Sequence, residues 1–207
     1  MLDLYSILIS LPIIVLSSAV HEFAHAFAAD QLGDLTPRTD GRLTLNPFVH
    51  ISPMGLISML VAKFGWSKPV RINEYNFQNP VLDAAITAIA GPTSNFLIAL
   101  VFSAIYNLFN IYNSPWLIHT IVFEIILINL GLTIFNLLPI PPLDGSRVVR
   151  LLLPNKLRPY WESIEKHSTF IILLFLLPIS PIGQFTSSLI SSAMSFLLRF
   201  LIPQPFI

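Results

Sequence analysis

The stretch ILISLPIIVLSSAVHEFAHAFAA, residues 7–29, decides the fold of this 207-residue chain. It is a continuous apolar run whose ionisable side chains all fall in one short segment, HEFAH (His21–His25). The first twenty residues carry a single charge, Asp3, and at about 1.5 Å per residue a helix of that length crosses most of a bilayer core. The run therefore predicts a transmembrane helix that ends just before Gly33.

A cleaved signal peptide is the rival interpretation of this first segment. Ser17 and Ala19 resemble the small residues of a cleavage site. The basic residues that open a signal peptide are missing, however, and the apolar run continues past both positions to Ala29. We therefore expect the segment to be retained as the first membrane span.

The composition of the whole chain also indicates a membrane protein. Hydrophobic residues make up 54% and charged residues 11%, and the mean hydropathy is +0.74, which is too apolar for a soluble domain of this size. The formal net charge is zero, so we expect no nucleic-acid partner. The chain has no cysteine, which excludes a thiolate nucleophile or a thiolate metal ligand.

Further apolar segments predict an all-α polytopic membrane protein with about five transmembrane helices. A short re-entrant or extended segment, Met54 to Gly65, follows the first helix, and the flanking loops 41–50 and 65–80 are expected to be extended. We expect one membrane domain over residues 1–207, with a core at 1–153 and a C-terminal helical hairpin at about 160–203. The further segments are Val81 to Phe109, His119 to Leu138, Thr169 to Ile182, which prolines interrupt, and Phe185 to Ile202.

The basic residues predict the orientation in the membrane. Five lie between the first and second spans, five follow the third span, and Arg199 stands near the end. The connection from Asn110 to Ile118 has none, as is typical of a non-cytoplasmic turn. We therefore expect the N-terminus outside, the HEFAH segment towards the cytoplasm, and a location in a prokaryotic cell membrane.

The HEFAH segment matches the pattern HExxH. On a helix this pattern places two imidazoles, His21 and His25, on one face where they can share a zinc ion, and Glu22 reaches the attacking water. A structural role is the alternative, but a charge within a span costs at least about 2.5 kcal/mol, so ionisable residues there indicate function. The segment predicts a catalytic zinc site.

Catalytic zinc usually holds three protein ligands, so one more is needed. Asp144 is the best candidate, because it follows the third span and precedes Gly145, where the backbone can turn sharply. The other acids lie within spans or in basic loops. The alternative role of Asp144 is that of an N-cap for a helix over Ser146 to Leu153.

The loop GRLTLNPFVHISPMG, residues 41–55, together with GWSKPVRINEYNFQNP, residues 65–80, resembles the compact prokaryotic members of the site-2 protease family of intramembrane zinc metalloproteases. Three motifs in a fixed order resemble the same family. They are HEFAH in the first span, GPTSNF (Gly91 to Phe96) in the second and NLLPIPPLDG (Asn136 to Gly145) after the third. No segment is long enough for the PDZ or CBS domains that some relatives carry. The resemblance implies that His21, His25 and Asp144 ligate one zinc ion per chain.

The resemblance also implies that Glu22 is the catalytic acid and base and that Asn95 and Asn136 line the site. An amide there can hydrogen-bond the substrate backbone or the oxyanion. The alternative is that each asparagine only joins helices. Gly91 and Pro92 are expected to allow close packing or a bend beside the site.

These observations predict a zinc metalloendopeptidase that cleaves peptide bonds within or near transmembrane segments. Its partners would be single-pass membrane proteins and the lipid bilayer. A metal-binding membrane transporter, or a catalytically silent homologue that acts as a binding partner, would use the same histidines. Glu22 discriminates between these functions, because only hydrolysis needs a base beside a ligand.

Overall fold

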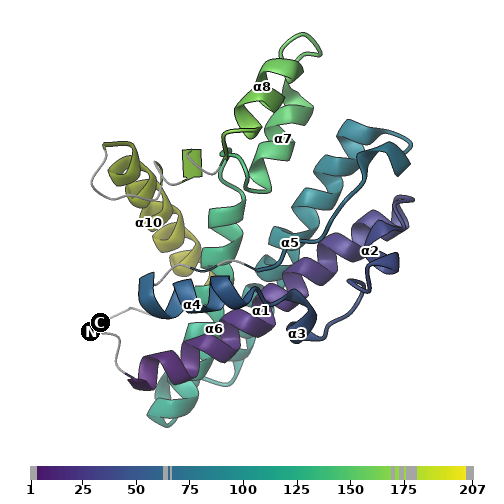
Figure 1. Cartoon of the computed structure of the whole chain (residues 1–207). Coiled ribbons are helices and arrows are strands. Elements are labelled where there is room, and N and C mark those ends of the chain that lie inside the picture. Colours follow the sequence, from purple (N-terminus) through teal and green to yellow (C-terminus); the bar gives the residue numbers. More distant parts are fainter. Residues whose placement is uncertain are drawn as a thin grey trace. The chain divides into compact units, whose positions relative to one another are not determined.

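The computed structural model describes residues 4–62, 65, 67–168, 171–172, 175 and 181–203, and confirms the all-α class for them (Figure 1). Their only pairing of extended backbone is an isolated bridge between Ile51 and Ser67. The helices are α1 (Leu4–Gln31), α2 (Thr36–Thr39), α3 (Pro47–His50), α4 (Pro53–Ala62), α5 (Pro80–Leu108), α6 (Trp116–Asn136), α7 (Gly145–Leu152), α8 (Arg158–Glu165) and α10 (Pro181–Leu201), with short 3-10 helices η1 (Glu74–Asn76) and η2 (Ile111–Asn113).

Three helices are long and apolar enough to cross a membrane, and they coincide with the first three predicted spans: Ile7–Gln31, Pro80–Leu108 and Trp116–Asn136. The predicted fourth span, Thr169 to Ile182, lies mostly outside the described residues. The fifth forms helix α10, but α10 is not among these three, because five serines, a glutamine and an arginine dilute its apolar residues. A total of five spans stays a prediction.

Two compact units divide the chain, Met1–Ser94 and Asn95–Ile207, and α5 contributes to both. In the first unit α2 and α3 contact α1. The turn after α1 uses Gly33, whose φ of +106° favours glycine, and the Asp34 amide bonds the Ala29 carbonyl at 2.9 Å. The predicted end of the first helix at Gly33 is confirmed. The single domain over 1–207, with its core and C-terminal hairpin, stays a prediction.

The two predicted extended loops are partly helical. Residues 47–50 form the short helix α3, because Asn46 accepts a hydrogen bond from the Phe48 amide and Pro47 occupies the first turn. Met54 to Gly65 was expected to be re-entrant or extended, and most of it belongs to helix α4. The segment of residues 67–73, called the strap below, has no regular secondary structure apart from the bridge at Ser67.

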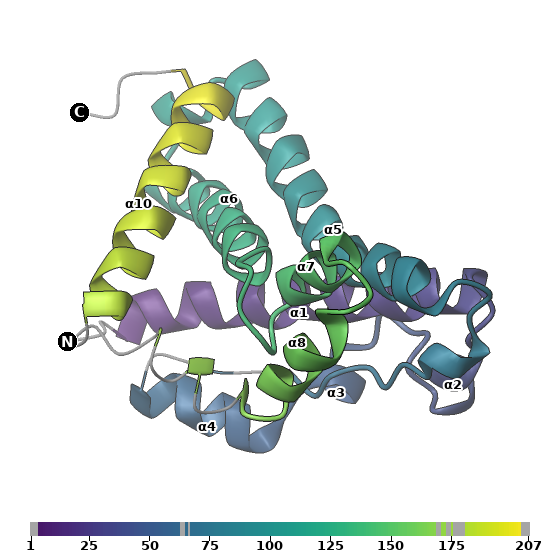
Figure 2. The same cartoon turned by 90° about the horizontal axis from the view of Figure 1, so that it is seen from above.

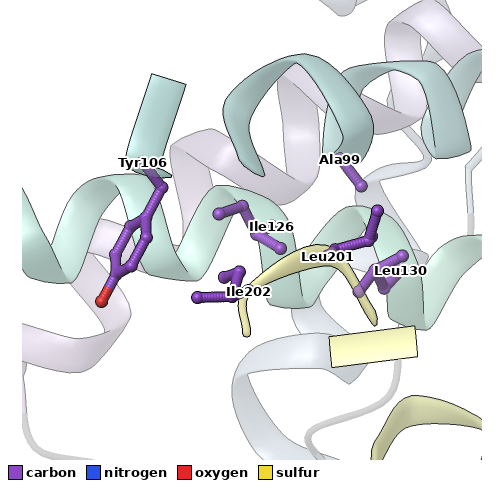
Figure 3. Packing of buried hydrophobic residues seen from close by; sticks show 6 residues of the cluster. All are labelled: Ala99, Tyr106, Ile126, Leu130, Leu201 and Ile202. Atoms are coloured by element: carbon purple, nitrogen blue, oxygen red, sulfur yellow. The ribbon is translucent and has the colours of Figure 1, made fainter. Parts of the chain in front are cut away.

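The second unit has a core between α5, α6 and α10. Six buried side chains form it: Ala99, Tyr106, Ile126, Leu130, Leu201 and Ile202 (Figure 3). The side-chain amide of Asn107 donates to the Leu201 carbonyl at 2.7 Å, which ties the end of α10 to α5. This packing positions α6, the helix that leads into the loop carrying Asp144.

Helices α7 and α8 follow that loop and lie side by side (Figures 1 and 2). Arg158 opens α8 and donates to the carbonyls of Arg150 and Leu153 near the end of α7. At the start of α7, a Cβ added to Gly145 would lie 2.3 Å from the Leu137 carbonyl oxygen. Only glycine therefore lets the chain fold back this closely on the end of α6.

Asp34 fastens the end of α1 to the strap. Its carboxylate is fully buried and accepts hydrogen bonds from the Thr36 hydroxyl at 2.5 Å, the Asn73 amide at 2.7 Å and the Asn76 side chain at 2.7 Å. Burial raises the pKa of Asp34, but these hydrogen bonds outweigh burial and hold the pKa below its ordinary value. The carboxylate is therefore a structural link in the first unit.

We expect Asp34→Asn to lower thermal stability in detergent by at least about 2 kcal/mol, because buried donors lose their acceptor. Since the pKa of Asp34 is depressed in the folded state, this stabilisation is present above about pH 4 and is lost as the pH falls further. The stability of the variant should therefore fall less than that of the wild type when the pH is lowered below about 4. Asp40→Asn is the control; its partner Arg71 is 79% exposed, so we expect a change under about 1 kcal/mol. Equal melting of the Asp34 variant and the wild type would contradict this role.

Candidate metal centre

The two histidines of HEFAH face each other on α1. Their Nε2 atoms lie 3.0 Å apart, and the ring centroids are 4.5 Å apart with the planes at 87°. Both side chains are buried. Two nitrogen ligands at about 2.0–2.1 Å from a tetrahedral zinc ion lie roughly 3.4 Å apart, so the spacing suits a shared ion. The structure thus brings His21 and His25 together as predicted.

Thr87 of α5 orients the ring of His25. The Nδ1 of His25 lies 2.7 Å from the Thr87 backbone carbonyl, which can only accept a hydrogen bond. Nδ1 therefore carries the proton, and Nε2 presents its lone pair towards His21. A carbonyl that fixes the tautomer in this way is the usual support of a metal-binding histidine. Sequence reasoning missed this contact, because a backbone carbonyl leaves no signal in the residue type.

Gly91 of α5 provides the space beside the two rings. A Cβ added there would lie 2.4 Å from Nε2 of His25 and 2.6 Å from Cε1 of His21. Any larger residue would have to displace rings whose nitrogens face the candidate metal position. The predicted close packing at Gly91 is confirmed, and the partners are the histidines themselves.

The strap holds Glu22, a residue that is 6% exposed. The Ser67 hydroxyl donates a hydrogen bond to Oε1, and the Val70 amide donates to Oε2 at 3.1 Å. Each carboxylate oxygen therefore has its own donor. Neither Ser67 nor Val70 was singled out from the sequence, although both belong to the loop of residues 65–80.

Asp144 belongs to the second unit and directly precedes α7. It is half-buried, and its side chain does not cap α7. Backbone carbonyls accept the hydrogen bonds of the first turn instead. The Ser146 amide donates to the Leu143 carbonyl and the Arg147 amide to the Asp144 carbonyl, both at 3.0 Å. The alternative role of an N-cap is therefore not supported. The role of Asp144 as the third ligand stays a prediction.

Asn95 and Asn136 also belong to the second unit. Asn95 is fully buried in α5, and its amide donates to the Asn129 side chain of α6 at 2.9 Å. Asn136 donates to the Leu132 carbonyl of its own helix at 3.0 Å. The first contact fits the alternative that Asn95 joins helices. Contacts of either residue with substrate stay a prediction.

Comparison with known proteins gives two kinds of match. The sequence profile of peptidase family M50 matches residues 112–179. A protein of Bacillus subtilis named as zinc metalloprotease YwhC is 39% identical over 178 residues, which cover 83% of this chain and 80% of that protein. Zinc metalloprotease Rip2, as it is named in Mycobacterium tuberculosis, is 30% identical over 173 residues, covering 79% of this chain and 65% of its own length. No solved structure matches the chain.

We expect Gly91→Ala to weaken zinc binding at least tenfold, because the added methyl group displaces rings that need fixed positions. Gly131→Ala in α6 is a matched control, since its Cβ would lie 3.7 Å from Met194 Cε, an ordinary contact. Zinc retained by each purified chain against a competing chelator measures the effect. If Gly91→Ala retained as much zinc as the wild type, the close approach of Gly91 to the histidine rings would not be needed for metal binding.

Proposed function

Because the chain belongs to peptidase family M50, the site-2 protease family of zinc metalloproteases, we propose that it is an intramembrane metalloendopeptidase. It would hydrolyse peptide bonds within or near transmembrane segments of single-pass membrane proteins. The observation that carries the proposal is the arrangement on one turn of α1. There His21 and His25 bring their Nε2 atoms to 3.0 Å, and a buried carboxylate, Glu22, stands beside them.

One zinc ion would be held by His21, His25 and Asp144. Two imidazole nitrogens and one carboxylate oxygen are donors that catalytic zinc commonly takes, with a fourth position left open. The fixed tautomer of His25 and the space at Gly91 also suit an ion at the histidine pair. When bound, zinc supplies Lewis-acid polarisation of the scissile carbonyl and makes water a stronger acid at neutral pH.

Glu22 would transfer the protons of hydrolysis. Its carboxylate accepts the proton of the attacking water and then delivers it to the nitrogen of the leaving amine. The carboxylate belongs to the residue next to His21, so it is close to one ligand by covalent geometry alone. Its burial keeps bulk water from competing for these proton transfers.

The substrate must open before it can be cleaved. An intact transmembrane helix satisfies its carbonyls internally, and lipid offers no replacement partner. Segments with proline, glycine or polar residues unwind at lower cost. We therefore expect the enzyme to prefer membrane segments that contain such residues near the cleaved bond.

The chain is a membrane protein, and its basic loops support one orientation. The N-terminus would be outside and the HEFAH segment would face the cytoplasm of a bacterial cell. On this arrangement, soluble products would leave into the cytoplasm.

We expect Glu22→Gln to retain the zinc of the wild type and to lose cleavage by at least about a hundredfold, because the amide cannot take up the proton. The probe is a reconstituted transmembrane peptide with a central Gly-Pro pair between a fluorophore and a quencher. An all-leucine peptide of equal length is the uncleaved control. Equal cleavage by both enzymes would refute the role of Glu22 in proton transfer, whereas no cleavage by the wild type would favour a transporter or a binding partner.

We expect Asp144→Ala to lower the bound zinc to well under half of one ion per chain, since two histidines alone make an incomplete site. Metal analysis of the purified chain measures this. Asp40→Ala, which removes a partly exposed acid that pairs with Arg71, is the control. One full zinc ion in Asp144→Ala would show that the third ligand comes from another residue.

A further inference from the structure

The strap reaches Glu22 through one side chain and one backbone group. The Ser67 hydroxyl donates to Oε1, and the Val70 amide donates to Oε2. Hydrogen bonds to a charged acceptor are stronger than neutral ones. Two donors on separate oxygens define the plane of the carboxylate, which a single donor would not.

The strap is itself held in place by other parts of the first unit. The Lys68 amide donates to the His50 carbonyl at 2.7 Å. Arg42, which is 7% exposed, donates to the carbonyls of Val49 at 2.5 Å and of Lys68 at 3.4 Å. The backbone that carries Ser67 is therefore held by the bridge with Ile51 and by the contacts of Lys68.

We propose that Ser67 is a positioning residue for the reaction, which fixes the carboxylate of Glu22 in the orientation that receives the proton of water. The inference rests on the proposed function, since it assigns Ser67 to the same proton transfer. A glutamate side chain rotates about three bonds, and an acid or base must be held within a narrow range of angles to act. The donors of the strap remove this freedom before substrate arrives.

An inhibitory role is the alternative for the same contact. If the strap blocked Glu22, removing the hydroxyl would release the carboxylate and raise the rate. The two roles therefore predict opposite changes in kcat. Ser67 is the residue to test, because the Val70 contact comes from the backbone and would survive replacement of its side chain.

The first experiment compares Ser67→Ala and Ser67→Thr on the Gly-Pro peptide. We expect Ser67→Ala to lower kcat about ten- to a hundredfold with KM within about twofold, the loss of one charge-assisted hydrogen bond. Ser67→Thr keeps a hydroxyl and should recover most of kcat. Ser187→Ala removes an exposed hydroxyl that bonds only its own helix, and should match the wild type. Unchanged or increased kcat in Ser67→Ala would overturn the inference.

The second experiment tests the contact between Ser67 and Glu22 through the melting temperature, with no measurement of activity. Ser67→Ala should lower the melting temperature of the wild type but have little effect in a Glu22→Ala background, where its partner is absent. Zinc content should be equal in Ser67→Ala and the wild type. Equal shifts in both backgrounds would overturn the inference. No cleavage of the Gly-Pro peptide by the wild type would instead refute the proposed function, and the melting experiment would still test the contact, so the two failures are distinguishable.

Discussion

The hydrogen bond between His25 and the Thr87 carbonyl is the contact on which the candidate centre depends. It connects α1 with α5 through two residues 62 positions apart, and it decides which nitrogen of the ring is left for a ligand. Gly91 follows Thr87 by one helical turn, so the helix that supplies the carbonyl also leaves room for the rings. The strap supplies the hydrogen-bond donors for the remaining polar group, the carboxylate of Glu22.

This arrangement follows from the cost of polar groups in an apolar helix. A histidine or glutamate in such a segment needs partners, and in this chain they come from a helix backbone, a loop amide and a hydroxyl. The partners are separated from HEFAH by 45 to 62 residues, so the centre forms only when α5 and the strap have packed against α1. Assembly of this polar centre therefore requires the packed fold of the first unit.

Local patterns predicted much of this structure. An apolar run with few charges predicted the first three spans, Gly33 ended the first helix, and the spacing of HEFAH placed both imidazoles on one face. The contacts of Thr87 and Ser67 were missed because they depend on long-range packing and, in one case, on backbone alone. The extended prediction for residues 47–50 failed because Asn46 and Pro47 form a local helix start. The predicted total of about five spans stays a prediction, because the serines of α10 lower its hydropathy and the fourth predicted span lies mostly outside the described residues.

The glycine at position 91 offers a way to distinguish relatives of this chain that can still form the metal centre from those that cannot. A protein that keeps HExxH can still have lost its centre if the helix beside the motif no longer allows the rings to approach. The residue at the position of Gly91 reports on that approach independently of the motif. Sequences that retain both histidines but carry a bulky residue there are the first candidates for members that have exchanged hydrolysis for binding.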